Sequence, residues 1–179
     1  MKRVWDPLVR LLHWSLLAAI AIAWASTLHI GVPGAWHETA GFVAMACVGV
    51  RLIWGFVGPR HARFSSFLRG ASVTWSYARR VRQGDAPRYI GHNPLGAWMV
   101  MVLLLDIGSL TVVGWLQTTD RYWGSEPLEV VHTALAWSLL PLIGLHVAGV
   151  LLTSLHQREN LAHSMIHGRK PAPGPGDID

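Results

Sequence analysis

The sequence predicts an all-α, integral membrane four-helix bundle, and two observations carry this prediction. Hydrophobic residues make up 51% of the 179-residue chain and charged residues only 14%, well below the roughly 25% charged residues of soluble domains. Four apolar segments are each long enough to cross a bilayer, which takes about 20 residues of helix. We expect these helices at about residues 8–30, 37–57, 94–116 and 128–155.

Residues that begin or end helices bound the four segments. They are Gly31 to Gly34 after the first, Gly58-Pro59 after the second, Asn93-Pro94 before the third and Glu126-Pro127 before the fourth. We therefore expect one four-helix domain over residues 1–168, with a loop at 58–93 that contains a short interfacial helix. The Pro- and Gly-rich residues 169–179 are predicted to be a disordered tail.

The basic residues indicate the orientation of the helices. Fourteen of the 15 Lys and Arg residues lie within residues 2–10, 51–88 and 158–170. If the chain crosses the membrane four times, these three stretches lie on one side of it and Arg121 lies on the other. Because basic loops stay in the cytoplasm, both termini are predicted to be cytoplasmic in a multi-pass protein of the bacterial inner membrane. This pattern explains the net charge of +5, so we expect membrane lipid and no nucleic acid as a partner.

Cysteine usage restricts the chemistry. Cys47 is the one cysteine of the chain and lies within an apolar segment. A single thiol excludes an internal disulfide, a Cys-x-x-Cys site and an iron–sulfur cluster. The absence of Cys-x-x-Cys-His likewise excludes covalently attached c-type haem.

Ten histidines in a mostly apolar chain are the informative anomaly, because ionisable groups inside a membrane are costly and usually functional. His132 and His146 both lie in the fourth segment, 14 residues apart. In a straight helix this spacing puts them on one face, about 40° and about 21 Å apart. Since imidazole is a common axial ligand of haem iron, one helix can offer a ligand to each of two stacked haems.

Matching depths in the membrane supply the second ligands. His13 and His146 lie at similar depth near the cytoplasmic side, and His37 and His132 at similar depth near the outer side. We therefore predict two non-covalent b-type haems, ligated by His13 with His146 and by His37 with His132. The alternatives are four histidines hydrogen-bonded inside a bundle, and His29 as a rival ligand at the outer haem.

Further polar residues near the cytoplasmic boundary suggest additional contacts with a cofactor or substrate. Arg10 and Arg51 can pair with haem propionates or simply set topology and snorkel. His92 can contact a propionate or a quinone, or belong to a helix cap. Together these three residues suggest a quinone site beside the cytoplasmic haem. Asp106, deep in the third segment, fits either a proton step or a protonated interior side chain.

These residues resemble the bacterial cytochrome b561 family, which includes the cytochrome b subunits of nickel–iron hydrogenases. The similarity is carried by Trp5-Asp6-Pro7, Arg10-Leu-Leu-His13-Trp14, Trp36-His37-Glu38, Gly91-His92-Asn93-Pro94-Leu95-Gly96, and His132 with His146. The resemblance implies a four-helix bundle with two b haems that exchange electrons with membrane quinone. It also implies a redox partner at the periplasmic face, and it assigns the ligand role to the same four histidines.

The leading functional hypothesis is transmembrane electron transfer between the quinone pool and a periplasmic redox protein. Acidic outer residues would attract a basic partner such as a c-type cytochrome: Glu38, Asp120, Glu126 and Glu129. Whether the chain is an enzyme, as a quinone oxidoreductase, stays open at this stage. The alternatives are a superoxide oxidase, a hydrogenase-type cytochrome b anchor subunit, and a redox-silent membrane anchor or haem-handling protein.

Overall fold

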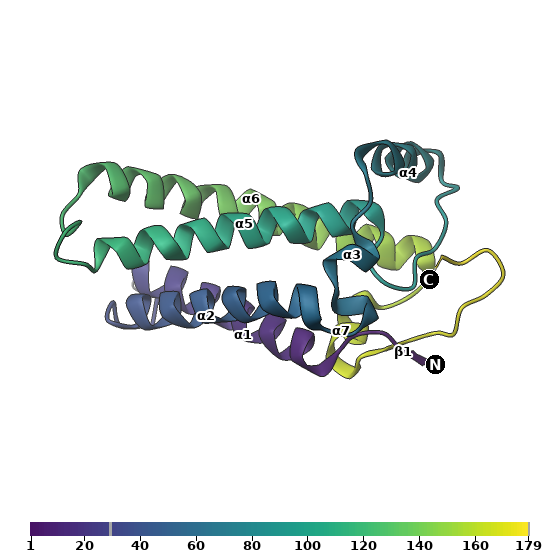
Figure 1. Ribbon diagram of the computed structural model, residues 1–179, viewed down its shortest axis with the longest axis horizontal. Coiled ribbons are helices and arrows are strands. Elements are labelled where there is room, and N and C mark those ends of the chain that lie inside the picture. Colours follow the sequence, from purple (N-terminus) through teal and green to yellow (C-terminus); the bar gives the residue numbers. More distant parts are fainter. Residues whose placement is uncertain (29, 179) are drawn as a thin grey trace. The chain divides into compact units, whose positions relative to one another are not determined.

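The computed structural model describes residues 1–28 and 30–178 and confirms the predicted all-α fold (Figure 1). Its elements in chain order are β1 (Lys2–Arg3), α1 (Pro7–Thr27), α2 (Trp36–Val57), a 3-10 helix (Arg60–Ala62), α3 (Phe64–Phe67), α4 (Ala71–Gln83), α5 (Pro94–Gln117), α6 (Glu126–Gln157), α7 (Leu161–His167) and β2 (Arg169–Lys170).

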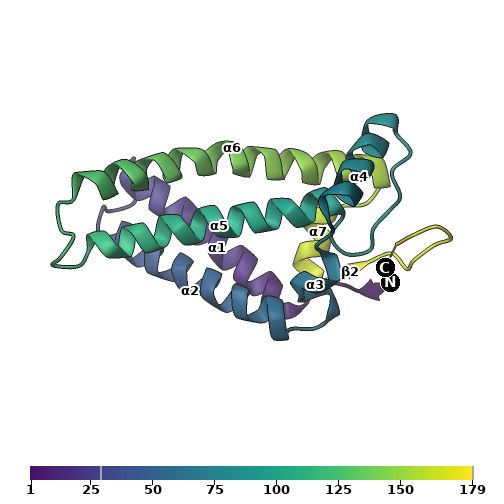
Figure 2. The ribbon, with the colours of Figure 1, turned by 45° about the horizontal axis from the view of Figure 1, so that its top comes forward.

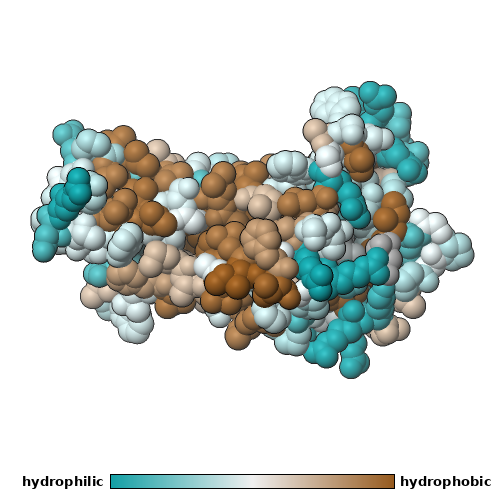
Figure 3. Space-filling model, viewed as in Figure 1, coloured by the Kyte–Doolittle hydropathy of each residue, from teal (hydrophilic) through white to brown (hydrophobic). Residues whose placement is uncertain are grey.

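The helices α1, α2, α5 and α6 are each long and apolar enough to cross a membrane. Their bounds lie close to the four spans expected from the sequence. Large apolar side chains stand on their surfaces, such as Leu105, which is 73% exposed, and Leu152, which is 68% exposed. Figure 3 shows hydrophobic residues gathered over the long helices and hydrophilic ones toward the helix ends. Such extensive apolar surface is expected where the surroundings are lipid rather than water.

Side-chain caps explain where two of these helices begin. The Asp6 carboxylate accepts hydrogen bonds from the backbone N–H groups of Leu8 and Val9 at 2.9 and 3.2 Å, and the first residue of α1 is Pro7. The Asn93 side chain accepts the N–H of Gly96 at 2.8 Å. In both cases the cap satisfies an N–H that has no partner within the helix, and proline fits the first helical position.

Two compact units make up the described chain. Unit 1 contains residues 1–10, 53–102 and 144–179, and unit 2 contains residues 11–52 and 103–143. Unit 1 therefore holds the Arg-rich loop and both terminal segments. Unit 2 holds parts of all four long helices.

Side-chain contacts inside unit 2 connect its four helical segments. The rings of Trp24 on α1 and Trp137 on α6 lie 5.4 Å apart, edge to face. A Cβ on Gly108 of α5 would lie 3.6 Å from the Val48 side chain of α2, which is ordinary packing distance. These contacts make unit 2 a helical bundle.

The terminal segments pair with each other in unit 1. β1 and β2 are antiparallel, with Lys2 opposite Lys170 and Arg3 opposite Arg169, and Figure 2 shows β2 beside the N-terminal end of the chain. The buried Trp5 indole donates a hydrogen bond to the Ser164 hydroxyl at 3.0 Å. This link fastens α7 to the segment that precedes α1.

The C-terminal segment, for which the composition of residues 169–179 predicts disorder, makes backbone contacts with other parts of unit 1 over its described residues. Besides the strand β2, the backbone N–H of Ile90 donates to the carbonyl of Ile178, and the N–H of Ile178 donates to the carbonyl of Arg88, both at 2.9 Å. Composition alone predicts disorder because it counts few apolar residues. It does not register that a distant loop supplies partners for this backbone.

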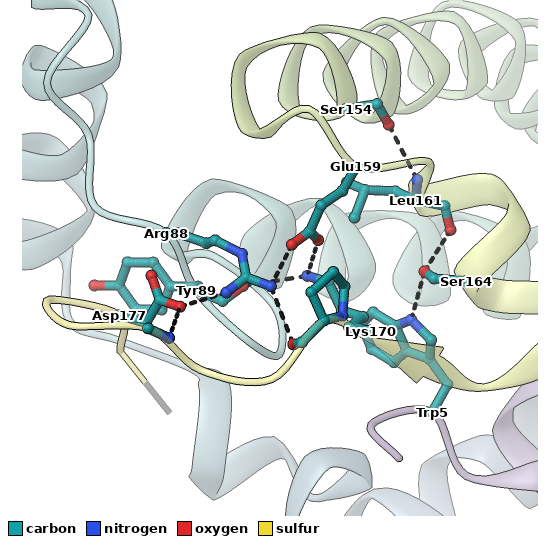
Figure 4. Close-up of polar contacts among 11 residues, drawn as sticks. Trp5, Arg88, Tyr89, Ser154, Glu159, Leu161, Ser164, Lys170 and Asp177 are labelled. Carbon is teal, nitrogen blue, oxygen red and sulfur yellow. Dashed lines mark hydrogen bonds and ion pairs between the residues drawn. The ribbon is translucent and has the colours of Figure 1, made fainter. Parts of the chain in front are cut away.

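A buried network of charges holds this segment in place (Figure 4). Arg88 forms ion pairs with both Glu159 and Asp177. The Lys170 ammonium lies 3.5 Å from Glu159 and donates to the carbonyl of Tyr89 at 3.3 Å. The Lys170 side chain is only 2% exposed and that of Glu159 only 8%, so these charges depend on each other for solvation.

The loop helix α4 is anchored by a single buried side chain. Tyr77 is the buried residue of this helix, and its ring lies 5.4 Å from that of Tyr89, edge to face. Burial, and then the neighbouring Tyr89, raise the pKa of Tyr77 to about 12. Trp75, on the same helix, is 71% exposed. An exposed indole beside Arg residues fits the predicted interfacial helix.

Candidate functional site

Two histidines that the sequence singles out come together inside unit 2. The rings of His37, at the start of α2, and His132, near the start of α6, have their centres 6.1 Å apart and their planes at 64°. Both side chains are partly buried.

The orientation of His37 is set by the C-terminal turn of α1. Its Nδ1 lies 3.1 Å from the carbonyl oxygen of Ala23 and 3.0 Å from the Thr27 hydroxyl. The Thr27 and Ser26 hydroxyls both donate to that same carbonyl, at 3.0 and 2.8 Å. Because a carbonyl can only accept, Nδ1 must carry the proton, and Nε2 is then the nitrogen with a lone pair.

The surroundings of His132 leave its ring in close contact with α5. A Cβ on Gly114 would lie 3.0 Å from Cε1 of His132 and 3.4 Å from its Nδ1, so glycine is what lets the ring lie against this helix. Leu110 of the same helix also lies near the His132 imidazole. Its buried Nδ1 has no hydrogen-bond partner among the described residues. A buried nitrogen of this kind is suited to a ligand that the protein itself does not supply.

The separation of the two rings fits a metal ion held between them. Metal–imidazole bonds are about 2 Å long, so an ion bound by both rings would set their centres about 6 Å apart. The rings of His37 and His132 meet this requirement with the observed 6.1 Å. No group of three or more His, Cys, Asp and Glu side chains that could hold a metal ion is found over residues 1–28 and 30–178. Two imidazoles therefore fit an ion whose other ligands come from a macrocycle, as in haem.

The other two predicted ligands fall in different units. His13, on α1, belongs to unit 2, and His146, on α6, belongs to unit 1. Their pairing stays a prediction.

Pro141 lies inside α6 between His132 and His146, and a proline within a helix removes a backbone hydrogen bond and tends to kink the helix. The angle of about 40° between these two histidines applies to a straight helix. The rival ligand His29 lies outside the described residues.

Arg10, Arg51 and His92, which the sequence grouped at the cytoplasmic boundary, have separate surroundings. Nη1 of Arg10 donates to the carbonyl of Ile166 at 2.9 Å. Arg51 is buried, with 8% of its surface exposed, within unit 2. Arg10 and His92 both belong to unit 1 but line different hollows there. A shared role of the three residues stays a prediction.

Aromatic rings hold His92 on two sides. Its ring centre lies 4.9 Å from that of Trp5 and 4.5 Å from that of Phe67. With His61 and Ile178, among others, it lines a hollow of about 30 Å³. That volume is enough for one or two water molecules. A quinone ring at His92 would therefore have to displace neighbouring side chains.

Asp106 has a partner on the neighbouring helix. The hydroxyl of Ser138, on α6, donates to Oδ1 of Asp106, on α5, at 2.8 Å. The second carboxyl oxygen is buried without a hydrogen-bond partner in the described parts of the chain. The structure thus gives Asp106 one hydrogen-bond partner on the neighbouring helix, and its role stays a prediction.

Sequence reasoning missed the residues that position the candidate ligands. Ser26, Thr27 and the carbonyl of Ala23 act on His37 from a different helix, and Gly114 makes room for His132. The only indication in the sequence was that a Ser and a Thr stand at the end of an apolar helix, where their hydroxyls can bind a neighbouring side chain. Nothing in the sequence states which histidine they face.

The known proteins that this chain resembles are cytochromes. The family model of prokaryotic cytochrome b561 matches residues 4–168. Curated relatives named "Probable Ni/Fe-hydrogenase B-type cytochrome subunit" are 24% identical in Rhodobacter capsulatus, over 75% of this chain, and 24% identical in Azotobacter vinelandii, over 92%. The chain spans 61% of the first relative's length and 86% of the second's.

No solved structure matches the chain significantly. The family match nevertheless covers nearly all of it, including every histidine proposed as a ligand. The chain therefore belongs to the prokaryotic cytochrome b561 family.

Proposed function

We propose that this protein carries electrons across the bacterial membrane through two b-type haems. In this proposal the quinone pool exchanges electrons with the haem on the side of the Arg-rich loop, and a redox protein exchanges them at the other side. Membership of a b-type cytochrome family implies b-type haem. The number of haems, the quinone and the partner are the proposed parts.

The observation that carries the proposal is the geometry of His37 and His132. The Ala23 carbonyl and Thr27 hydroxyl fix the proton of His37 on Nδ1, which directs the lone pair of Nε2 away from them. His132 faces this ring from α6 at 6.1 Å between centres. His37 and His132 would hold this haem, which would supply one-electron chemistry.

The second haem rests on His13 and His146. Membership of the family and the presence of His146 on the same continuous helix as His132 support it. We assign the propionate and quinone contacts on that side to Arg10, Arg51 and His92, as the sequence predicts. The orientation, with both termini in the cytoplasm, likewise rests on the distribution of basic residues.

The partner at the periplasmic side is proposed from charge. Glu38, Glu126 and Glu129 lie in the first turns of α2 and α6, and Asp120 lies between α5 and α6. Such a set attracts a basic surface and raises the association rate at low salt. A c-type cytochrome is the class of partner that we propose.

A membrane subunit of a hydrogenase is the second candidate function. The names of the curated relatives favour it, because each describes a B-type cytochrome subunit of a nickel–iron hydrogenase. In that case the partner at the outer side would be the hydrogenase itself rather than a c-type cytochrome. A superoxide oxidase is a further alternative, and measuring reduction of the protein by superoxide distinguishes it from the other two functions.

The test uses the purified protein in lipid nanodiscs. We expect a b-type optical spectrum, two haems per chain, and reduction of both haems by a ubiquinol or menaquinol analogue. A protein with one haem or none, or one that quinol leaves oxidised, would contradict the proposal. Rapid reduction by superoxide without any partner would favour the superoxide oxidase, and reduction by hydrogen only with added hydrogenase would favour the subunit role.

Replacing Thr27 by valine should weaken the haem held by His37. Valine keeps the shape of threonine but removes the oxygen that lies 3.0 Å from Nδ1 of His37. Residues that orient a ligand through its second ring nitrogen typically change metal affinity by about 10- to 100-fold. We expect haem transfer to apomyoglobin to become about tenfold faster for one of the two haems.

The matched control is Thr118→Val, because among the described residues the Thr118 hydroxyl donates only to the carbonyl of Trp115 in the last turn of α5, at 2.8 Å. This variant should lose haem at the rate of the unmodified protein. Equal rates in the two variants would show that Thr27 does not position His37.

A further inference from the structure

A basic hollow in unit 1 is lined by none of the four histidines proposed to ligate haem, although it shares Arg10 with the proposed propionate contacts. It has a volume of about 370 Å³ and is lined by Met1, Arg3, Arg10, His167 and Arg169. Every ionisable side chain in this lining is an arginine or a histidine, and no carboxylate contributes to it. The hollow is therefore suited to an anion.

The backbone around Gly168 brings these side chains together. Gly168 has a φ of +83°, and a Cβ at this position would lie 2.8 Å from Nη1 of Arg10 and 2.9 Å from the carbonyl oxygen of Trp5. Its own carbonyl accepts the N–H groups of Val4 and Trp5 at 2.9 and 3.1 Å. Arg10 in turn donates to the carbonyl of Ile166. A residue with a side chain is excluded by both the φ and these contacts.

The pairing of β1 with β2 places two like charges face to face. Arg3 lies directly opposite Arg169 in the antiparallel register, an arrangement that destabilises a strand pair. Neither arginine has an ion pair with a carboxylate among the described residues. The nearby acidic groups are engaged elsewhere: Asp6 with the start of α1 and with Trp54, and Glu159 and Asp177 with Arg88. A bound anion would relieve this repulsion.

His167 completes the hollow as a neutral donor. Its Nδ1 accepts the backbone N–H of Arg169 at 3.0 Å, so the proton of a neutral ring lies on Nε2. Desolvation, followed by the charges of His163, Arg169 and Arg10, lowers the pKa of His167. This lowering favours the neutral ring. It presents one N–H to an anion while the arginines supply the charge.

We propose that this hollow binds the phosphate of an anionic phospholipid headgroup. Arg10 lies within the first turns of the membrane-spanning helix α1, which places the hollow at the level of lipid headgroups. Basic pockets at the ends of membrane helices are the sites where such headgroups bind. Ile166, next to His167, is 60% exposed and offers an apolar rim for an acyl chain. A free phosphate ion shares the chemistry but has no use for that rim.

Native mass spectrometry of the haem-loaded protein in detergent tests this assignment. Cardiolipin, phosphatidylglycerol or phosphatidylcholine is titrated into the unmodified protein and into the double variant Arg3→Gln, Arg169→Gln. We expect one anionic lipid to be retained, and its affinity to fall about 25-fold in the double variant, since each surface cation contributes about fivefold. The double variant Arg3→Lys, Arg169→Lys should recover most of the affinity.

The matched control is Arg79→Gln, Arg82→Gln, which removes two exposed charges from α4, elsewhere in unit 1. Haem content shows that each variant is folded. An equal loss of lipid in the control pair would overturn the site in favour of general attraction by the basic surface. Equal retention of phosphatidylcholine, or displacement of the lipid by millimolar inorganic phosphate alone, would overturn the lipid assignment.

Discussion

Replacing His132 by alanine is expected to lower the haem content from two per chain to one. The ring of His132 faces that of His37 at 6.1 Å between centres, and no third candidate ligand lies beside this pair among the described residues. Loss of one imidazole leaves the iron with a single protein ligand in a non-covalent site. Haem quantification of the purified variant, with the optical spectrum of the remaining haem, measures the effect.

His156→Ala is the matched control for this prediction. His156 lies on the same helix, in the last turn of α6, and its side chain is exposed. The control should keep both haems. His37→Ala should lose the same haem as His132→Ala, and the double variant should lose no more than either single one. Two haems in His132→Ala, or different residual haems in the two single variants, would contradict the proposed pair.

Replacing Glu159 by glutamine is expected to release the C-terminal segment from unit 1. Glutamine keeps the size of the side chain but removes the charge that faces Lys170 and Arg88 (Figure 4). Breaking a buried ion pair by removing one partner costs about 3–5 kcal/mol, because the other charge stays buried without compensation. Amide hydrogen exchange at Lys170 and Ile178 should become at least about 100-fold faster.

The effect should also depend on pH. Burial, which is the largest cause, lowers the pKa of Lys170 below its ordinary value of 10.5, and Glu159 counteracts this. Folding then favours the neutral amine of Lys170. The free energy of unfolding is therefore lower at a pH below the folded-state pKa of Lys170, and it rises as the pH is raised from there toward 10.5. Without Glu159 the destabilisation should be full at pH 7 and should decrease in alkaline buffer.

Asp85→Asn is the control, because Asp85 pairs with Arg80 at 3.5 Å on the surface, with side chains 62% and 46% exposed. Exposed pairs of this kind contribute little, so hydrogen exchange at Lys170 should be unchanged. A Glu159→Gln variant that exchanges as slowly as this control would show that the network does not hold the segment.

The membrane fold follows from properties that are local in the sequence. A run of about 20 apolar residues must form a helix in lipid, because no water is there to bind its backbone groups. The caps at Asp6 and Asn93 act within three residues of themselves. The four spans and their ends could therefore be predicted closely.

The candidate ligands could also be named from the sequence, since a histidine inside an apolar helix is rare and costly. Depth along each helix suggested which histidines could meet, and His37 and His132 do lie together. What could not be predicted is how each ring is held. The tautomer of His37 depends on the carbonyl of Ala23, 14 residues away, and the position of His132 depends on a glycine in another helix.

By itself, then, the sequence determined that this protein is an all-α membrane protein with histidines at two depths, because hydrophobicity and helical periodicity act over short distances. Only the tertiary structure shows which residues the C-terminal segment meets and that Arg3 faces Arg169 beside Arg10. The reason is that these contacts join residues far apart in the sequence, such as Lys170 and Tyr89, which are 81 positions apart. Composition predicts how much surface a segment can bury, but not which distant backbone or charge it meets.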